Sequence, residues 1–237
     1  MQLELKQIAK SFESKEVLKS IDFTFEKGKI YGLLGRNGAG KTTLFNCLSG
    51  ELEVDEGSST LYFTDLESSK CQRPLSDEDI GYVYSTPILP DFLTGYEFIK
   101  FYMEVNQEHI DSAKTVEDYF DMMEFNKEDR HALIKGYSHG MKNKLQMLCY
   151  FITQPPIILL DEPLTSLDVV VALEIKKLLR EIRKDRIIIF STHILQLATD
   201  LCDEIVILND GKLEQVDHNM LHSSDFEEKI IALLKDE

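Results

Sequence analysis

Tryptophan is absent from this 237-residue sequence, and long apolar runs are absent too. The longest purely apolar run covers residues 147–152, far short of the ~20 residues that a membrane-spanning helix needs. The amino-terminal stretch MQLELKQIAK lacks the apolar core of a signal peptide. Cysteines are few and have no CxxC spacing, which favours reduced thiols over a disulfide framework or a zinc site: Cys47, Cys71, Cys149 and Cys202. We therefore expect a cytosolic protein.

Basic residues are also scarce. The 26 Lys and Arg against 42 Asp and Glu give a net charge of −16, and no basic stretch stands apart from that background. A surface that follows nucleic-acid phosphates needs clustered Lys and Arg, so we expect no nucleic-acid partner. Hydrophobic residues make up 43% of the chain, which excludes a disordered protein and is enough for a sizeable core.

Strand-like and helix-like patterns alternate along the chain, which predicts an α/β fold with a mainly parallel sheet. The first thirty residues have the alternation of an antiparallel strand pair. IILLD and RIIIFSTH are bare apolar runs, typical of parallel strands covered on both faces. The stretch EIVILNDGKLEQVD predicts a hairpin, and the end of the chain predicts a helix.

Residues 87–152 have a helical pattern that interrupts the strands of the sheet. We therefore expect one domain over residues 1–237. Its core, with an antiparallel β part at the amino terminus and a helix at the carboxyl terminus, would comprise 1–86 and 155–237. The inserted helical subdomain would comprise 87–154.

A glycine-rich stretch, GRNGAGKT at residues 35–42, fits the pattern G-x-x-x-x-G-K-[ST] between a predicted strand and a predicted helix. Glycines let the backbone wrap phosphates, and the amides of the helix N-terminus supply positive charge. Lys41 can reach the β- and γ-phosphates, and the Thr42 hydroxyl can ligate Mg²⁺. The alternative is a glycine-rich turn with an incidental lysine; the strand-to-helix context favours an ATP site in a P-loop NTPase.

Two acidic residues and a histidine follow the two buried runs. Asp161 ends IILLD, where a carboxylate can hold the water shell of Mg²⁺, and Glu162 can polarise a water at the γ-phosphate. His193 ends the second run, and the ends of parallel strands converge on a ligand crevice. The alternatives are acidic residues that merely follow a strand and a solvated or capping histidine.

Together these motifs resemble the ATP-binding subunit of the ABC transporter family, over essentially the whole chain. GRNGAGKTT resembles the Walker A motif and IILLDE resembles Walker B with its catalytic glutamate. The resemblance implies stacking of adenine on Phe12, a D-loop ending in Asp168 that links two sites, and a switch role for His193. It also implies that one set of residues holds the phosphates and Mg²⁺: Gly35, Asn37, Gly38, Ala39, Gly40, Lys41, Thr42 and Thr43, with Asp161 as a further metal residue.

The stretch YSHGM lies where the family has its signature, 23 residues before Asp161. In the family this loop binds the γ-phosphate held by the Walker A motif of a second subunit. The resemblance implies that Ser138, His139 and Gly140 take that role, at a helix that we expect to start near Met141. Capping of that helix by the serine is compatible with this role, whereas a Ser–His hydrolase lacks its Gly-x-Ser-x-Gly elbow.

The chain departs from the family pattern in two places. His139 replaces the first glycine of the signature, which places a side chain near the composite site. Ser85 stands where the family has the glutamine of its Q-loop, and a serine is too short to reach the metal. The form Tyr-Ser-x-Gly-Met-Lys resembles the branch that exports drugs and peptides.

The resemblance implies an ATPase subunit that powers an ABC transporter, with ATP and Mg²⁺ as cofactors. It would lie on the cytoplasmic face of the membrane, bind an integral membrane permease, and dimerise with a second ABC ATPase subunit around ATP. The alternative is a soluble ABC-type ATPase with a regulatory or ribosome-associated role. A GTPase is disfavoured because no Asn-Lys-x-Asp motif is present.

Overall fold

The computed structural model describes the chain except residues 65–68, 111–113, 164–168, 218–229 and 231–237. The chain divides into two compact units, and each is described by itself. The first unit comprises Met1–Tyr82, Pro156–Glu162 and Arg180–Glu237, and the second comprises Val83–Pro155 and Pro163–Leu179. None of the helices in the described part of the chain is long and apolar enough to cross a membrane.

The first unit begins with an antiparallel sheet in the order β2-β1-β4-β5. Alternate side chains of β1, such as Leu3 and Leu5, are buried, as expected for strands with one face on the core. The expected pairing within the first thirty residues is confirmed, because Phe12 pairs with Lys15 across the turn. The strands are β1 (Gln2–Phe12), β2 (Lys15–Glu26), β4 (Glu56–Thr64) and β5 (Lys70–Pro74).

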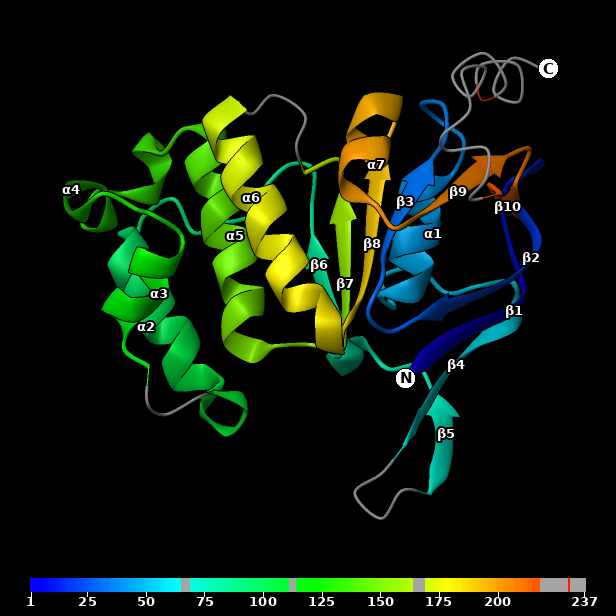
Figure 1. The fold of residues 1–237 in the computed structure, drawn as a ribbon, viewed down its shortest axis with the longest axis horizontal. Helices are drawn as coiled ribbons and strands as arrows, with labels where there is room; N and C mark the ends of the chain where they lie inside the picture. Colours follow the sequence, from blue (N-terminus) through cyan, green and yellow to red (C-terminus); the bar gives the residue numbers. More distant parts are fainter. Residues whose placement is uncertain (65–68, 111–113, 164–168, 218–229, 231–237) are drawn as a thin grey trace. The chain divides into compact units, whose positions relative to one another are not determined.

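A second sheet has the order β10-β9-β3-β8-β7-β6 (Figure 1). Strand β3 pairs in parallel with β8 and β9, and β7 pairs in parallel with β8, while β10 returns antiparallel to β9. Every residue of β3, β7 and β8 is buried, as their bare apolar runs predict. The strands are β3 (Ile30–Leu34), β6 (Ile80–Val83), β7 (Ile157–Asp161), β8 (Ile187–Thr192), β9 (Glu204–Asn209) and β10 (Lys212–Gln215).

Two helices of the first unit contact these strands. Helix α1 (Lys41–Leu48) contacts β7 and β2, and α7 (Leu195–Leu201) contacts β3 and β8. Leu34 of β3 lies beside Thr192 of β8, so the carboxyl ends of these parallel strands lie at one edge of the sheet. The register therefore brings the segments that follow β3, β7 and β8 to the same edge.

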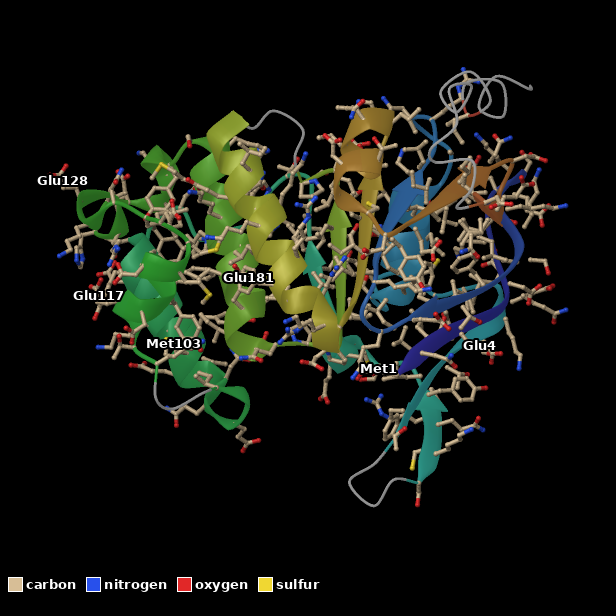
Figure 2. The ribbon with its side chains drawn as sticks, viewed as in Figure 1. Met1, Glu4, Met103, Glu117, Glu128 and Glu181 are labelled. Carbon is tan, nitrogen blue, oxygen red and sulfur yellow. The ribbon has the colours of Figure 1, made fainter. Side chains whose placement is uncertain are left out.

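The second unit is helical and contains a buried arginine, Arg130. Arg130 donates to the backbone oxygen of Phe125 and pairs with Glu117 and Asp121, of which Glu117 is labelled in Figure 2. The ion pair between Lys144 and Glu174 joins α5 to α6. The helices are α2 (Gly95–Val105), α3 (Val116–Met122), α4 (Lys127–Arg130), α5 (His139–Thr153) and α6 (Val169–Ile182), whose last residues belong to the first unit.

The predicted fold class is confirmed: a P-loop NTPase fold of the α/β type, with an antiparallel β part, a mainly parallel sheet and inserted helices. The division into units differs from the expected one, because Pro163–Leu179 groups with the helical unit through contacts such as the α5–α6 ion pair. The predicted carboxyl-terminal helix lies almost entirely outside the described residues. The expected single domain over the whole chain stays a prediction.

Candidate functional site

The glycine-rich loop joins β3 to α1, as the sequence predicts. Gly40 is the N-cap of α1 at φ 105°, and a Cβ there would lie 2.9 Å from Val17 Cγ1. The position therefore requires glycine for both its backbone conformation and its close approach to β2. In the described chain no side chain caps α1, so the amides of its first turn are open to an anionic ligand.

Lys41 is buried beneath this loop. Its ammonium donates to the backbone oxygen of Gly35 at 2.8 Å and to that of Arg36 at 3.1 Å. Burial lowers the pKa of Lys41 from its ordinary value, and the carboxylates of Glu162 and Asp161 oppose that shift. The ammonium is thus held inside the loop by two neutral carbonyl acceptors. A phosphate, as a charged acceptor, would bind it more strongly.

Asp161 lies at the end of β7, and each of its carboxylate oxygens accepts a hydrogen bond from a hydroxyl group. Thr42 Oγ1 donates to Asp161 Oδ2 at 2.8 Å, and Ser191 Oγ donates to Asp161 Oδ1 at 2.5 Å. The lone pairs of Thr42 Oγ1 remain as acceptors, next to a carboxylate that is only 4% exposed. These are the oxygen donors that Mg²⁺ prefers, and Mg²⁺ completes such sites with substrate phosphates.

Glu162 lies one residue beyond β7, against the end of β8. Its Oε1 lies 3.1 Å from His193 Nδ1 and 3.8 Å from Lys41 Nζ. The structure thus brings together the three side chains predicted to lie at the γ-phosphate. The backbone of Glu162 is in the left-handed region at φ 47°, which costs a side-chain-bearing residue about 1 kcal/mol or more. A strained residue that carries a carboxylate at a strand end is typical of a catalytic position.

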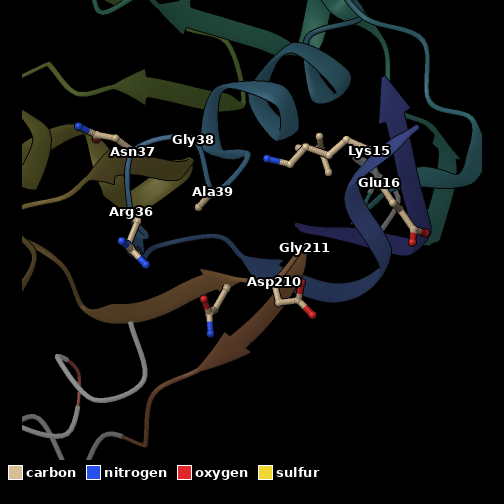
Figure 3. Close-up of a pocket in the computed structure, with 10 residues that line it drawn as sticks. Lys15, Glu16, Arg36, Asn37, Gly38, Ala39, Asp210 and Gly211 are labelled. Atoms are coloured by element: carbon tan, nitrogen blue, oxygen red, sulfur yellow. The ribbon is translucent and has the colours of Figure 1, made fainter. Parts of the chain in front are cut away.

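A cavity of about 310 Å³ lies beside the loop (Figure 3). Its walls are the loop residues 36–39, residues 15–17 at the start of β2 and residues 209–211 at the β9–β10 turn. Phe12, predicted to stack on adenine, ends β1 just before residues 15–17 and is 47% exposed. Lys10 Nζ lies 5.9 Å from the centre of its ring. Adenine stacking on Phe12 stays a prediction.

The signature stretch belongs to the second unit and starts α5. Ser138 is the N-cap of α5 and accepts a hydrogen bond from the Met141 amide at 3.2 Å, so the predicted capping is confirmed. The helix begins at His139, two residues earlier than expected, because the serine caps it directly. The side chains of Ser138 and His139 are exposed, and Gly140 lies in the first turn. The roles of these three residues toward ATP stay predictions.

Tyr137, one residue ahead of the signature serine, is a buried structural residue. Its hydroxyl donates to the Asp129 backbone oxygen at 2.6 Å. Burial raises the pKa of Tyr137 to about 12, so the hydroxyl keeps its proton and donates at neutral pH. The ring needs the space left by Gly95, where a Cβ would lie 2.1 Å from the Tyr137 hydroxyl oxygen. The two positions are therefore coupled across 42 residues of sequence.

We expect Gly95→Ala to destabilise the protein by about 1–3 kcal/mol through this overlap. The midpoint of thermal unfolding, followed by circular dichroism, measures the effect. Tyr137→Phe removes the oxygen, so the double variant Gly95→Ala/Tyr137→Phe should lose less stability than the two single variants added together. Strict additivity would show that the alanine is accommodated elsewhere.

Two predicted positions remain: Ser85, which the structure describes, and the D-loop, which it does not. Ser85 is exposed just beyond β6, and the neighbouring Tyr84 carbonyl accepts a hydrogen bond from Gln146 Nε2 at 3.2 Å. The predicted D-loop, residues 165–168 with Asp168, lies outside the described residues. Its role in linking two sites stays a prediction.

Sequence reasoning missed one residue of this site. Ser191 is fully buried in β8 and binds both Asp161 and the Glu162 amide. The signal in the sequence is a serine directly after the apolar residues IIIF, at the carboxyl end of a predicted buried strand. A hydroxyl in such a place needs a buried partner.

Comparisons with known proteins agree with this geometry. The sequence profile of the ABC transporter family matches residues 18–165. The uncharacterized ABC transporter ATP-binding protein YxlF of Bacillus subtilis is 33% identical over 213 residues, which cover 89% of this chain and 69% of that protein. A sulfate/thiosulfate import ATP-binding protein, CysA of Bacillus cereus, is 29% identical over 91% of this chain and 61% of its own length.

Solved structures show the same fold. The ATP-binding subunit of an ABC transporter superposes with a TM-score of 0.79 at 23% identity, over 99% of this chain and 100% of the other. A dimeric ATP-binding cassette in a post-hydrolysis state with ADP and Pi has a TM-score of 0.73 at 20% identity, over 90% of this chain and 98% of the other.

Proposed function

The chain belongs to the ABC transporter family and carries its ATPase domain, and from this premise we propose that it hydrolyses ATP to drive an associated transporter. The observation that carries the proposal is the placement of Glu162. Its carboxylate lies beside His193 and Lys41, at the edge of the sheet where α1 begins. A carboxylate there can polarise a water that attacks the γ-phosphate, and proton transfer of this kind contributes about 10²–10⁴ in rate.

We propose Mg²⁺ as the second cofactor. Thr42 Oγ1 and Asp161 would hold the ion or its waters, and the ion would neutralise charge on the β- and γ-phosphates. The loop amides and Lys41 would bind the phosphates, and His193 would steady the γ-phosphate. The phosphate-binding set would be Gly35, Asn37, Gly38, Ala39, Gly40, Lys41, Thr42 and Thr43.

We further propose that two copies, or this chain and a second ABC ATPase, close around ATP. Ser138, His139 and Gly140 of one subunit would then contact the ATP bound by the other, and Asp168 would link the two sites. Support comes from the exposed start of α5, whose first turn carries no acidic residue.

We propose an integral membrane permease as the partner, at the cytoplasmic face of the membrane, and export as the direction. Export rests on the likeness of YSHGM to the exporter branch, whereas one relative is named as an import protein. The decisive experiment is affinity purification of the tagged chain from detergent-solubilised membranes. Recovery of a stoichiometric polytopic protein supports the proposal, and co-sedimentation with ribosomes would instead favour the soluble role. Substrate accumulation in inside-out vesicles would then establish export.

An exposed apolar patch of the helical unit is our candidate for the permease contact. We define the Phe92 patch as Phe92 and Leu133, which are 79% and 49% exposed. Their segments lie side by side, since Thr94 bridges to Leu133 and the Ile134 amide donates to the Leu93 oxygen. Exposed apolar side chains on neighbouring segments are typical of a protein contact. Among the aromatic residues of this region, Phe92 and Phe101 are exposed, and Tyr96, Phe98 and Tyr102 are half-buried.

We expect Phe92→Glu to abolish recovery of the permease while the isolated subunit still hydrolyses ATP, because the charge cannot be buried against an apolar helix. Affinity purification and steady-state ATPase assays measure the two effects. Phe101→Glu is a matched control, since Phe101 is 59% exposed on α2. If both variants still recover the permease, the contact lies elsewhere.

A further inference from the structure

Ser191 is fully buried at 0% exposure near the end of β8. It follows four apolar residues and lies directly beside Asp161 in the register of β7 and β8. The interstrand pairing therefore fixes the distance between these two side chains, and no mobile loop intervenes.

The Ser191 hydroxyl both donates and accepts a hydrogen bond. Its single hydroxyl proton is donated to Asp161 Oδ1 at 2.5 Å, and its oxygen accepts the Glu162 amide at 3.0 Å. Thr42 occupies the other oxygen of the same carboxylate. One hydroxyl thus connects the side chain of Asp161 to the backbone of the next residue.

The backbone of Glu162 requires such a restraint. Its φ of 47° lies in the left-handed region, which a residue with a side chain keeps only when its surroundings hold it there. Ser191 lies in β8, and His193 is the first residue after that strand. The first holds the amide of Glu162 and the second contacts its carboxylate, so this segment holds the residue at both ends.

We propose that Ser191 is a positioning residue for ATP hydrolysis. Its hydroxyl orients the metal-binding carboxylate of Asp161 and fixes the backbone of Glu162 with the same pair of hydrogen bonds. The Mg²⁺ site and the water-polarising carboxylate would thereby be held in a fixed position relative to each other. This inference rests on the proposed ATPase function and adds a residue to which the sequence motifs assign no role.

Ser191→Ala tests the inference without adding volume to the buried site. Mg²⁺ is titrated into the protein with a fluorescent, non-hydrolysable ATP analogue, and ATP turnover is measured separately. We expect about a tenfold loss of Mg²⁺ affinity and a similar fall in kcat, as for other residues that orient a metal ligand. Affinity for the analogue in EDTA should change by less than about twofold, because Ser191 does not touch the phosphate loop.

Three further variants complete the test. Ser191→Thr keeps the hydroxyl and should restore most of the Mg²⁺ affinity, while Ser191→Cys, a poor hydrogen-bonding group of similar size, should behave as the alanine variant does. Tyr31→Phe removes another buried hydroxyl of this sheet, which accepts the Glu26 amide at 2.8 Å, and should leave Mg²⁺ affinity unchanged.

Several outcomes overturn the inference. They are a folded Ser191→Ala protein with wild-type Mg²⁺ affinity, an equal loss in Tyr31→Phe, and a folded Ser191→Thr protein as weak as Ser191→Ala. Loss of the folded state in both the alanine and cysteine variants would assign Ser191 to the fold instead. Failure of the wild-type chain to bind or hydrolyse ATP would overturn the proposed function itself, which is a separate result.

Discussion

Glu162→Gln should slow ATP turnover by a factor of about 10²–10⁴ while leaving ATP binding intact. Glutamine keeps the size and polarity of the side chain, so the contact with His193 can persist. It lacks the carboxylate that draws a proton from the attacking water. ATP should therefore accumulate on the protein, and the closed dimer with it. Phosphate release measures the first effect, and gel filtration with and without ATP measures the second.

Glu181→Gln is the matched control for this variant. Glu181 is exposed near the end of α6, and Figure 2 labels its side chain. It loses the same charge without touching the site, so turnover and oligomeric state should match those of the wild type. A Glu162→Gln protein with undiminished turnover and only monomer in the presence of ATP would contradict both the role of Glu162 and the proposed dimer.

Local sequence was enough to predict the parts of the site that lie on one stretch of chain. The glycine pattern requires a loop between a strand and a helix, and that loop joins β3 to α1. Bare apolar runs predict buried strands, and such strands deliver Asp161 and His193 to one edge of a parallel sheet. Serine before an apolar helix predicts an N-cap, and Ser138 is one.

What could not be predicted depends on register and on distant contacts. The pairing of Asp161 with Ser191 places a hydroxyl against a carboxylate, but nothing in either strand alone specifies that alignment. The positive φ of Glu162 follows from contacts with β8 and has no glycine or asparagine to signal it. The space for Tyr137 is provided by Gly95 on α2, far away in the sequence. In each case packing between elements decides the outcome.

Removing the ammonium of Lys41 should reduce ATP affinity by about 10- to 100-fold, which is the usual range for hydrogen bonds to a charged group. In this structure the group is nearly inaccessible and already lies inside the loop, donating to two carbonyl oxygens. Phosphate binding therefore replaces weaker acceptors with stronger ones and needs little rearrangement of the side chain. Lys41→Ala and Lys41→Met should lose affinity to a similar extent, because methionine keeps the alkyl length and lacks only the charge and its donors. Equilibrium binding of a fluorescent ATP analogue measures the effect.

The loss should also be specific to this position. Lys27 is an exposed lysine of the same unit whose ammonium lies 3.5 Å from Asp185, so Lys27→Met removes an equal charge away from the loop. Its effect on ATP affinity should stay below about twofold, because an exposed charge is screened by solvent and salt. If Lys41→Met binds ATP as the wild type does, the loop amides alone supply the affinity. The ammonium would then stabilise the folded loop through its hydrogen bonds to the backbone oxygens of Gly35 and Arg36. In that case Lys41→Met should lower the thermal unfolding midpoint without ATP and leave the ATP-induced rise in that midpoint unchanged, whereas loss of phosphate binding would reduce that rise.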